Sequence, residues 1–230
     1  NTSYAFAVLG SGQLEHLYYG RKLHANEAVM TEKHTFIPGN TNVYNKDYSS
    51  YSLEDVCLEM SSLGKGDIRE PFIEVTYPNG SSTTDMVFDR AEIIQGKEEY
   101  DTLPGSYDDN GEVEQLVIYL KDRNYNLTLE LHYYVYEKCD IITRSAKLVN
   151  SGNESVRLER LMSMQLDLNE SDYELSFFNG AWAREMNRSR IPIRAGKYVN
   201  ESVTGTSSNR ANPFFMIGRS STTEDYGECY

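Results

Sequence analysis

The chain has 230 residues, with 35 acidic side chains against 22 basic ones and a net charge of −13. This length allows one large all-β domain or two small domains. The negative charge argues against a nucleic-acid partner, which would need clustered lysine and arginine. No apolar run reaches the roughly 18 residues of a membrane-spanning helix. We therefore expect no membrane partner and, with three widely spaced cysteines, a cytoplasmic location that keeps thiols reduced.

Alternating apolar and polar residues predict β-strands along most of the chain. Residues 4–9 and 14–19 are expected to form a hairpin around a glycine-containing turn. Tyr77–Ser81 contains Pro-Asn-Gly, the strongest hairpin signal in the chain. Four longer strands are also predicted, the last with a bulge that shifts its register: 114–122, 126–137, 140–150 and 156–168.

One segment, residues 52–60, has helical spacing, and Ser52 with Asp55 imitates a capping box. It allows two helical turns at most and is equally compatible with a structured loop. The remaining pattern of many long strands predicts two large antiparallel sheets packed face to face. We expect an all-β fold, with at most one or two short helices, in a single domain over residues 1–230.

The histidines and cysteines have no metal-ligand spacing, so we predict no metal and no cofactor. His16 and His132 lie in predicted strands, where a hydrogen-bonded structural histidine is the common case. Either could serve as the acid of a sandwich-type sugar epimerase, although no base opposite it is identified. Gly64–Pro71 resembles a phosphate-binding loop only in its glycines, because it precedes a strand and not a helix.

Within that segment we expect Asp67 and Arg69 to pair with each other or to cap backbone amides. Pro71 would then begin the strand that follows. A bidentate contact between arginine and a carboxylate holds a loop in one shape, so a structural role is favoured over substrate contact.

Six segments, in chain order, resemble the N-terminal part of glycoside hydrolase family 36, the bacterial and fungal α-galactosidases. They cover essentially the whole chain, and their order makes the resemblance specific. It implies a β-supersandwich related in fold to galactose mutarotases. The segments are TSYAFAVLGSGQLEHLYYGRKL (2–23), LEMSSLGKGDIREP (58–71), DIITRS (140–145), LMSMQLDL (161–168), NGAWARE (179–185) and GTSSNRANPF (205–214).

The resemblance also implies a function. It suggests the non-catalytic N-terminal domain of an enzyme that removes terminal α-D-galactosyl residues, as from raffinose or melibiose, with retention of configuration. Both catalytic aspartates of that family lie in a (β/α)₈ barrel, which the resemblance places outside residues 1–230. This chain alone is therefore expected to be inactive. Its implied partners are the barrel, neighbouring subunits of an oligomer and a galactoside substrate.

In the family, a loop after the second strand overhangs the active site of a neighbouring subunit. The matching stretch is Thr31–Phe36. It makes Glu32, Lys33 and His34 candidates for residues near the substrate, with Lys33 close to the position that is acidic in the family.

Trp182 is the only tryptophan in a chain with 18 tyrosines and 8 phenylalanines. Its ring is large and flat enough for a sugar to stack on it. Its small neighbours, with Glu185 nearby, favour a ring packed at a strand end or at a domain contact.

Two other classes of function stay open at the level of sequence. One is a free-standing carbohydrate-binding module, in which exposed aromatic residues bind sugar without chemistry. The other is a mutarotase-like sugar epimerase.

Overall fold

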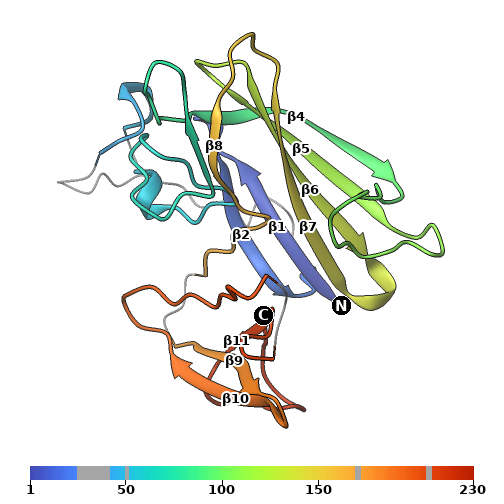
Figure 1. Ribbon diagram of the computed structural model, residues 1–230. Helices are drawn as coiled ribbons and strands as arrows, with labels where there is room; N and C mark the ends of the chain where they lie inside the picture. Colours follow the sequence, from blue (N-terminus) through green and yellow to red (C-terminus); the bar gives the residue numbers. More distant parts are fainter. Residues whose placement is uncertain (25–41, 50–51, 169–171, 206–208) are drawn as a thin grey trace. The chain divides into compact units, whose positions relative to one another are not determined.

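The computed structural model describes residues 1–24, 42–49, 52–168, 172–205 and 209–230 (Figure 1). Antiparallel strands dominate, which confirms the predicted all-β class. The chain divides into two compact units, Asn1–Asp167 and Leu168–Tyr230, called unit 1 and unit 2 below. The single-domain organisation stays a prediction. Eleven strands lie in the described residues: β1 Thr2–Val8, β2 Leu14–Arg21, β3 Ile73–Thr76, β4 Met86–Gln95, β5 Glu114–Asp122, β6 Leu127–Tyr136, β7 Ile141–Asn150, β8 Arg157–Leu161, β9 Glu174–Ala181, β10 Arg184–Pro192 and β11 Phe215–Gly218.

Unit 1 contains the four-stranded sheet β4-β5-β6-β7 and the strand pairs β1–β2 and β3–β8. The sheet runs through the green and yellow part of the ribbon in Figure 1. Period-two alternation along β6 turns every second side chain toward the core. The largest core cluster joins this sheet to β2 and β3, and its most deeply buried members include Phe72, Ile73, Val75 and Leu129.

The turn predicted at Tyr77–Ser81 is present, but the hairpin is not. Tyr77 N donates to Ser81 O at 2.9 Å, and Gly80 N donates to Tyr77 O at 2.9 Å. However, β3 before the turn pairs with β8, and β4 after it pairs with β5. Local turn chemistry determines where the chain reverses, whereas the pairing partner depends on contacts distant in sequence.

The bulge predicted in residues 156–168 is confirmed. Glu74 pairs with Arg160 and Val75 pairs with Leu158, so Glu159 on β8 has no partner residue on β3. The strand ends at Leu161, shorter than predicted. Beyond Leu161, the side chains of Gln165 and Asp167 accept hydrogen bonds from backbone amides of residues 58–61.

The segment with helical spacing forms one 3₁₀ turn, η3, over Leu53–Asp55. Val56 already has extended backbone angles (φ −112°, ψ 133°), and the Ser52 side chain does not cap the turn. Instead Ser52 Oγ donates to Asn42 O at 2.8 Å. Leu53, Val56 and Leu58 of this segment fill a second small core, whereas Met60 packs in the large core cluster. Two other 3₁₀ turns are described, η2 at Lys46–Tyr48 and η4 at Glu137–Cys139.

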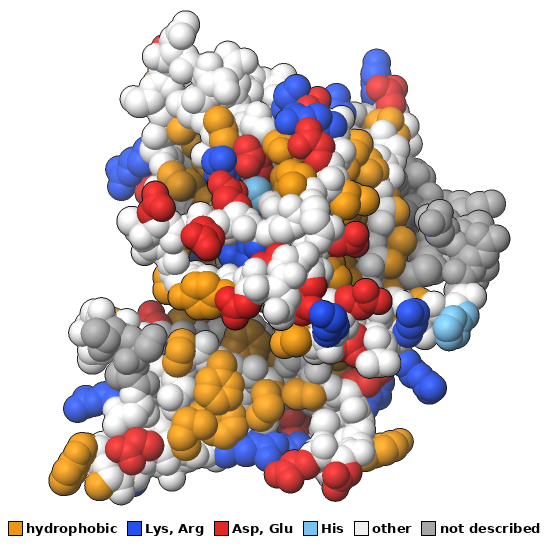
Figure 2. Space-filling model, turned by 90° about the vertical axis from the view of Figure 1, so that its right-hand side faces the viewer, with side chains coloured by type: hydrophobic (Ala, Val, Ile, Leu, Met, Phe, Trp, Pro, Cys, Tyr) orange, Lys and Arg blue, Asp and Glu red, His pale blue; other side chains and the backbone are white. Residues whose placement is uncertain are grey.

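Unit 2 is built on the three-stranded sheet β10-β9-β11. Among its described residues only two large apolar side chains are buried, Tyr173 and Leu175, at 7% and 8% exposed. Figure 2 shows hydrophobic side chains gathered on the surface of this unit, in the lower part of the view. Its exposed large apolar residues are Trp182, Met186, Ile193, Tyr198, Val199, Val203, Phe214, Phe215 and Tyr226.

Candidate functional site

The carboxylate of Glu59 lies fully buried at the centre of unit 1. Tyr4 OH, from β1, lies 2.8 Å from each carboxylate oxygen. His16 Nδ1, from β2, lies 2.6 Å from Oε1. Tyr133 OH, from β6, donates to Oε2 at 2.7 Å, and Arg144 Nη2, from β7, lies 3.2 Å from Oε2. We call these five residues the Glu59 network.

The network stabilises the ionised form of Glu59. Burial opposes ionisation of the carboxyl group. The hydrogen bond from His16, the charge of Arg144 and the hydroxyls of Tyr133 and Tyr4 outweigh that effect, so the pKa of Glu59 is lowered. Burial, followed by the negative charge of Glu59, raises the pKa values of Tyr4 and Tyr133. Both phenols therefore stay protonated and donate to the carboxylate.

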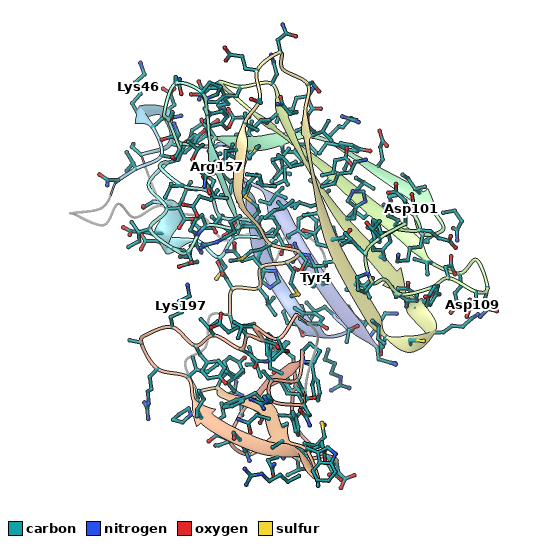
Figure 3. All side chains as sticks on the ribbon, in the orientation of Figure 1. Tyr4, Lys46, Asp101, Asp109, Arg157 and Lys197 are labelled. Atoms are coloured by element: carbon teal, nitrogen blue, oxygen red, sulfur yellow. The ribbon has the colours of Figure 1, made fainter. Side chains whose placement is uncertain are left out.

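Arg144 connects the network to the end of unit 1. Its guanidinium lies over the ring of Tyr133, 4.4 Å from the centroid, and its Nη1 lies 3.1 Å from Tyr4 OH. The same Nη1 donates to the backbone oxygen of Gln165 at 2.8 Å. The side chain of Arg144 is only 4% exposed, so its charge is compensated by Glu59 and these oxygens and not by water. Figure 3 labels Tyr4 on β1.

Two side chains after β8 hold the segment that carries Glu59. Asp167 Oδ2 accepts from Leu58 N at 2.9 Å, and Gln165 Oε1 accepts from Ser61 N at 2.9 Å. Gln165 Nε2 also donates to Asp167 Oδ1 at 3.1 Å. These side chains supplement a short backbone pairing of the Glu59 segment with β2, in which Glu59 N donates to Leu14 O at 3.1 Å and His16 N donates to Cys57 O at 2.9 Å.

Asp67 and Arg69 contact each other in the loop that follows. Asp67 Oδ1 accepts from both Nε (2.9 Å) and N (3.1 Å) of Arg69. The two terminal nitrogens of Arg69 reach the Asp167 carboxylate and the Leu53 backbone oxygen. Gly66 has a positive φ of +87°, and a Cβ there would lie 2.8 Å from Asn42 O. The pair therefore connects three segments; its role in the protein's function stays a prediction.

The Glu59 network is suited to holding strands together. Both oxygens of Glu59 already accept from donors of the chain, and the side chain has no exposed surface. An epimerase needs an acid and a base on opposite sides of a sugar ring, whereas His16 and Glu59 contact each other directly. Within the described ranges, no group of three or more His, Cys, Asp or Glu side chains is placed to hold a metal ion.

His132 is the second histidine that lies inside a strand. Its Nε2 lies 3.2 Å from Glu130 Oε2, and its Nδ1 lies 2.6 Å from Gln115 Nε2. Like His16 and Glu59, His132 and Glu130 contact each other directly and do not face each other across a space for a sugar ring.

Trp182 lies at the tip of the hairpin that joins β9 to β10, and it is 89% exposed. The next residue, Ala183, has a positive φ of 62°. Glu185 Oε1 accepts from Ala183 N at 2.9 Å, which supports the tight turn. The indole does not fill the core of unit 2, and a contact with another domain stays a prediction.

The candidate substrate-proximal residues Glu32, Lys33 and His34 lie outside the described residues.

Sequence reasoning did not identify the Glu59 network, although four of its five members, all but Tyr133, lie in the segments that carried the family resemblance. Tyr4 and His16 belong to the first segment, Glu59 to the second and Arg144 to the third. Glu59 lies between the apolar residues Leu58 and Met60, whereas Arg144 lies between Thr143 and Ser145, so only the glutamate had a local sign of burial. Pairing them requires knowledge of which strands are neighbours.

These observations define an all-β domain whose polar centre stabilises strands and leaves no carboxylate of that centre free for chemistry. Residues 12–230 match the Glycosyl hydrolase family 36 N-terminal domain. The chain belongs to this family.

Named relatives agree with that assignment. The chain is 35% identical to Alpha-galactosidase AgaA of Geobacillus stearothermophilus over 234 residues, which is 99% of this chain and 31% of the relative. It is 33% identical to the Bifunctional alpha-galactosidase/sucrose kinase AgaSK of Mediterraneibacter gnavus, over 100% of this chain and 25% of that protein. The chain therefore spans less than a third of the length of these relatives.

Solved structures are also similar. A crystal structure of an AgaA variant in complex with 1-deoxygalactonojirimycin superposes with a TM-score of 0.93 at 32% identity, covering 99% of this chain and 32% of that one. The α-galactosidase from Lactobacillus brevis gives a TM-score of 0.89 at 34% identity, with 96% and 30% of the two chains covered.

Proposed function

We propose that this chain is the non-catalytic N-terminal domain of an α-galactosidase that hydrolyses terminal α-D-galactosyl residues with retention. The single observation that carries the proposal is the pattern of coverage. Nearly the whole chain matches Alpha-galactosidase AgaA, yet the match spans only 31% of that protein. The family description assigns this part to the N-terminal domain.

The acidic side chains of unit 1 support a structural role. A retaining glycosidase needs two carboxyl groups about 5 Å apart that face the substrate. Buried carboxylates of this unit are instead engaged by donors of the chain. Glu59 has its network, Asp67 has Arg69, Asp85 accepts from Tyr44, and Asp122 accepts from the Asp85 amide.

The proposed role of the domain is to support assembly and to shape the substrate entrance of the longer enzyme. Its partners would be a catalytic barrel and neighbouring subunits, and its substrate class would be raffinose-type and melibiose-type galactosides. A structure of an AgaA variant contains raffinose. The exposed apolar residues of unit 2 support a contact with another domain, because extended apolar patches on a protein surface usually mark interaction sites.

We propose a cytoplasmic location.

No helix in the described ranges combines the length and the apolar character that crossing a bilayer requires.

The proposal is tested by assaying the 230-residue chain with an aryl α-galactoside, using Alpha-galactosidase AgaA as the positive control. Circular dichroism first establishes that the chain is folded. We expect release of the aryl group at the rate seen in buffer alone. Hydrolysis that follows the concentration of the purified chain would show that the reactive carboxylates lie within it and would overturn the proposal.

A further inference from the structure

The face of the β4-β5-β6-β7 sheet opposite the Glu59 network carries a second polar cluster. The strand register places Arg90 opposite Tyr119, Tyr119 opposite Glu130, and Glu130 opposite Lys147. Directly opposed residues in antiparallel strands project from the same face. A row of three charged side chains and one tyrosine therefore crosses all four strands.

A buried relay lies beside this row. With Gln115 Nε2 as the donor, Nδ1 of His132 accepts at 2.6 Å, and Nε2–H of His132 donates to Glu130 Oε2 at 3.2 Å. Gln115 and His132 are 4% and 5% exposed. Burial lowers the pKa of His132, although Glu130 opposes this effect. A neutral imidazole thus holds the Glu130 carboxylate in one orientation.

These side chains line an open cavity of about 470 Å³. Lys97 and Glu98, in the loop after β4, form part of its wall, and Tyr119 and Lys147 line it from the sheet. The volume is within the usual range of about 300–1,000 Å³ for small-ligand sites. Buried polar side chains that converge on such a cavity are a feature of ligand sites.

Hydrogen-bonding capacity remains unused in this cavity. Lys147 Nζ lies 3.6 Å from Glu130 Oε2, an ion-pair distance that is too long for a hydrogen bond. The contacts of Glu130 with His132 and with Lys147 both fall on Oε2. The cavity therefore presents a carboxylate acceptor next to an ammonium donor.

The balance of charge indicates the class of ligand. The lining contains two lysines, Lys97 and Lys147, and two glutamates, Glu98 and Glu130, so it carries no net charge. A phosphate would lie against two carboxylates, and a cation would lie against two ammonium groups. A neutral ligand with many hydroxyl groups satisfies both, because each hydroxyl donates and accepts.

We propose that this cavity binds a hexose unit of a neutral oligosaccharide. Glu130 and Lys147 would bind neighbouring hydroxyls, and the relay through His132 and Gln115 would hold Glu130 in place. The inference concerns binding alone, so it goes beyond the proposed role as an N-terminal domain and does not depend on it.

The test is a titration of the ¹⁵N-labelled 230-residue chain with raffinose, followed by amide chemical shifts. We expect saturable shifts confined to the cavity residues, including Gly96–Glu98, Tyr119 and Lys147. Lys147→Met should weaken binding about tenfold, because charged hydrogen-bond partners are lost. The matched control is Lys46→Met, since Lys46 is an exposed lysine of η2 outside the cavity; it should leave the affinity unchanged.

Competition by inorganic phosphate separates a saccharide site from an anion site. We expect phosphate at the same concentrations to leave the raffinose shifts unchanged. Three results would overturn the inference: no saturable shifts with raffinose, shifts that map elsewhere, or displacement of raffinose by phosphate. If Lys147→Met does not fold, the map of shifts in the unmodified chain decides. None of these results affects the hydrolysis assay, so the two proposals fail separately.

Discussion

Glu59 and Arg144 form a buried ion pair, with Arg144 Nη2 3.2 Å from Glu59 Oε2 and side chains only 0% and 4% exposed. The pair joins a segment without regular structure to strand β7. Tyr4, His16 and Tyr133 complete the shell around the carboxylate. A charge held in this way is costly to leave without its partner, because water does not reach it.

Arg144→Met should therefore lower the free energy of unfolding by about 3–5 kcal/mol, the usual cost of breaking a buried pair. Urea denaturation measures this change. Arg157→Met is the matched control, because Arg157 on β8 pairs with Glu159 at the surface with a side chain that is 79% exposed (labelled in Figure 3). That control should change stability little.

A double-mutant cycle sharpens the same prediction. Combining Glu59→Gln with Arg144→Met removes both charges, so the double variant should lose less stability than the sum of the two single variants. Strict additivity of the two losses would show that the pair is not coupled.

The unfolding free energy should also depend on pH through Glu59. Its pKa in the folded chain is below the ordinary value of 4.5. The unfolded chain therefore binds the proton more readily than the folded chain does. The stabilisation is fully present above pH 4.5 and is lost as the pH falls through the folded pKa.

The comparison that isolates this effect is between the unmodified chain and Glu59→Gln. The difference between their unfolding free energies should shrink as the pH is lowered from neutral into the acidic range below 4.5. Because all other carboxyl groups are common to both chains, their contributions cancel. A difference that stays constant over that range would contradict the assignment of a lowered pKa to Glu59.

Much of the strand arrangement is predictable from local pattern. The strand over 114–122 has the predicted bounds, and the first hairpin and the bulge near Glu159 are as expected. The apolar spacing of residues 52–60 was compatible with a short helix or with a structured loop, and the structure shows one 3₁₀ turn followed by an irregular segment. Periodicity over so few residues does not distinguish a helix from such a segment.

The polar centre was not predictable for a different reason. Each member of the Glu59 network looks ordinary within its own strand or loop. These residues form a network only because the fold brings their strands together. Strand order is a long-range property that the local sequence does not determine. The contact between Asp67 and Arg69 was accessible because both residues lie in one short loop.

Arg69 offers a test of how that loop is held. Its guanidinium reaches Asp67, Asp167 and the Leu53 backbone oxygen at once. Lysine keeps the charge but lacks the planar fork, so Arg69→Lys should lower the free energy of unfolding by about 1.5–3 kcal/mol, the range for hydrogen bonds to charged groups. Arg157→Lys, at an arginine of β8 whose side chain is 79% exposed, is the control and should have little effect. Equal stability of the two variants would show that charge alone holds the loop.

Gly180 tests the packing of the β9–β10 hairpin. A Cβ at this position would lie 2.5 Å from Arg184 O and 2.9 Å from Glu185 Cα. Since backbone atoms cannot move aside as a flexible side chain does, Gly180→Ala should destabilise the hairpin by about 1–3 kcal/mol. Gly105→Ala is the control, because its Cβ would meet only side-chain atoms at 3.4 Å or beyond. Hydrogen exchange of the β9 amides measures the local effect, and equal protection in both variants would count against this crowding.

Trp182 provides a direct probe of the predicted domain contact, because it is the only tryptophan in the chain. Its indole is 89% exposed, so acrylamide should quench its fluorescence efficiently in the 230-residue chain. Trp182→Ala should change the unfolding free energy by no more than about 0.5 kcal/mol, as is usual for a surface residue. Phe72→Ala, at a fully buried ring of the unit 1 core, is the contrasting variant and should lower the free energy of unfolding by about 3–5 kcal/mol.

The domain contact itself is tested in a longer protein that contains this chain, with every other tryptophan replaced so that only Trp182 fluoresces. If the indole contacts a further domain there, acrylamide should quench its fluorescence less than in the 230-residue chain. Equal quenching in the two proteins would remove the support for Trp182 as a domain contact.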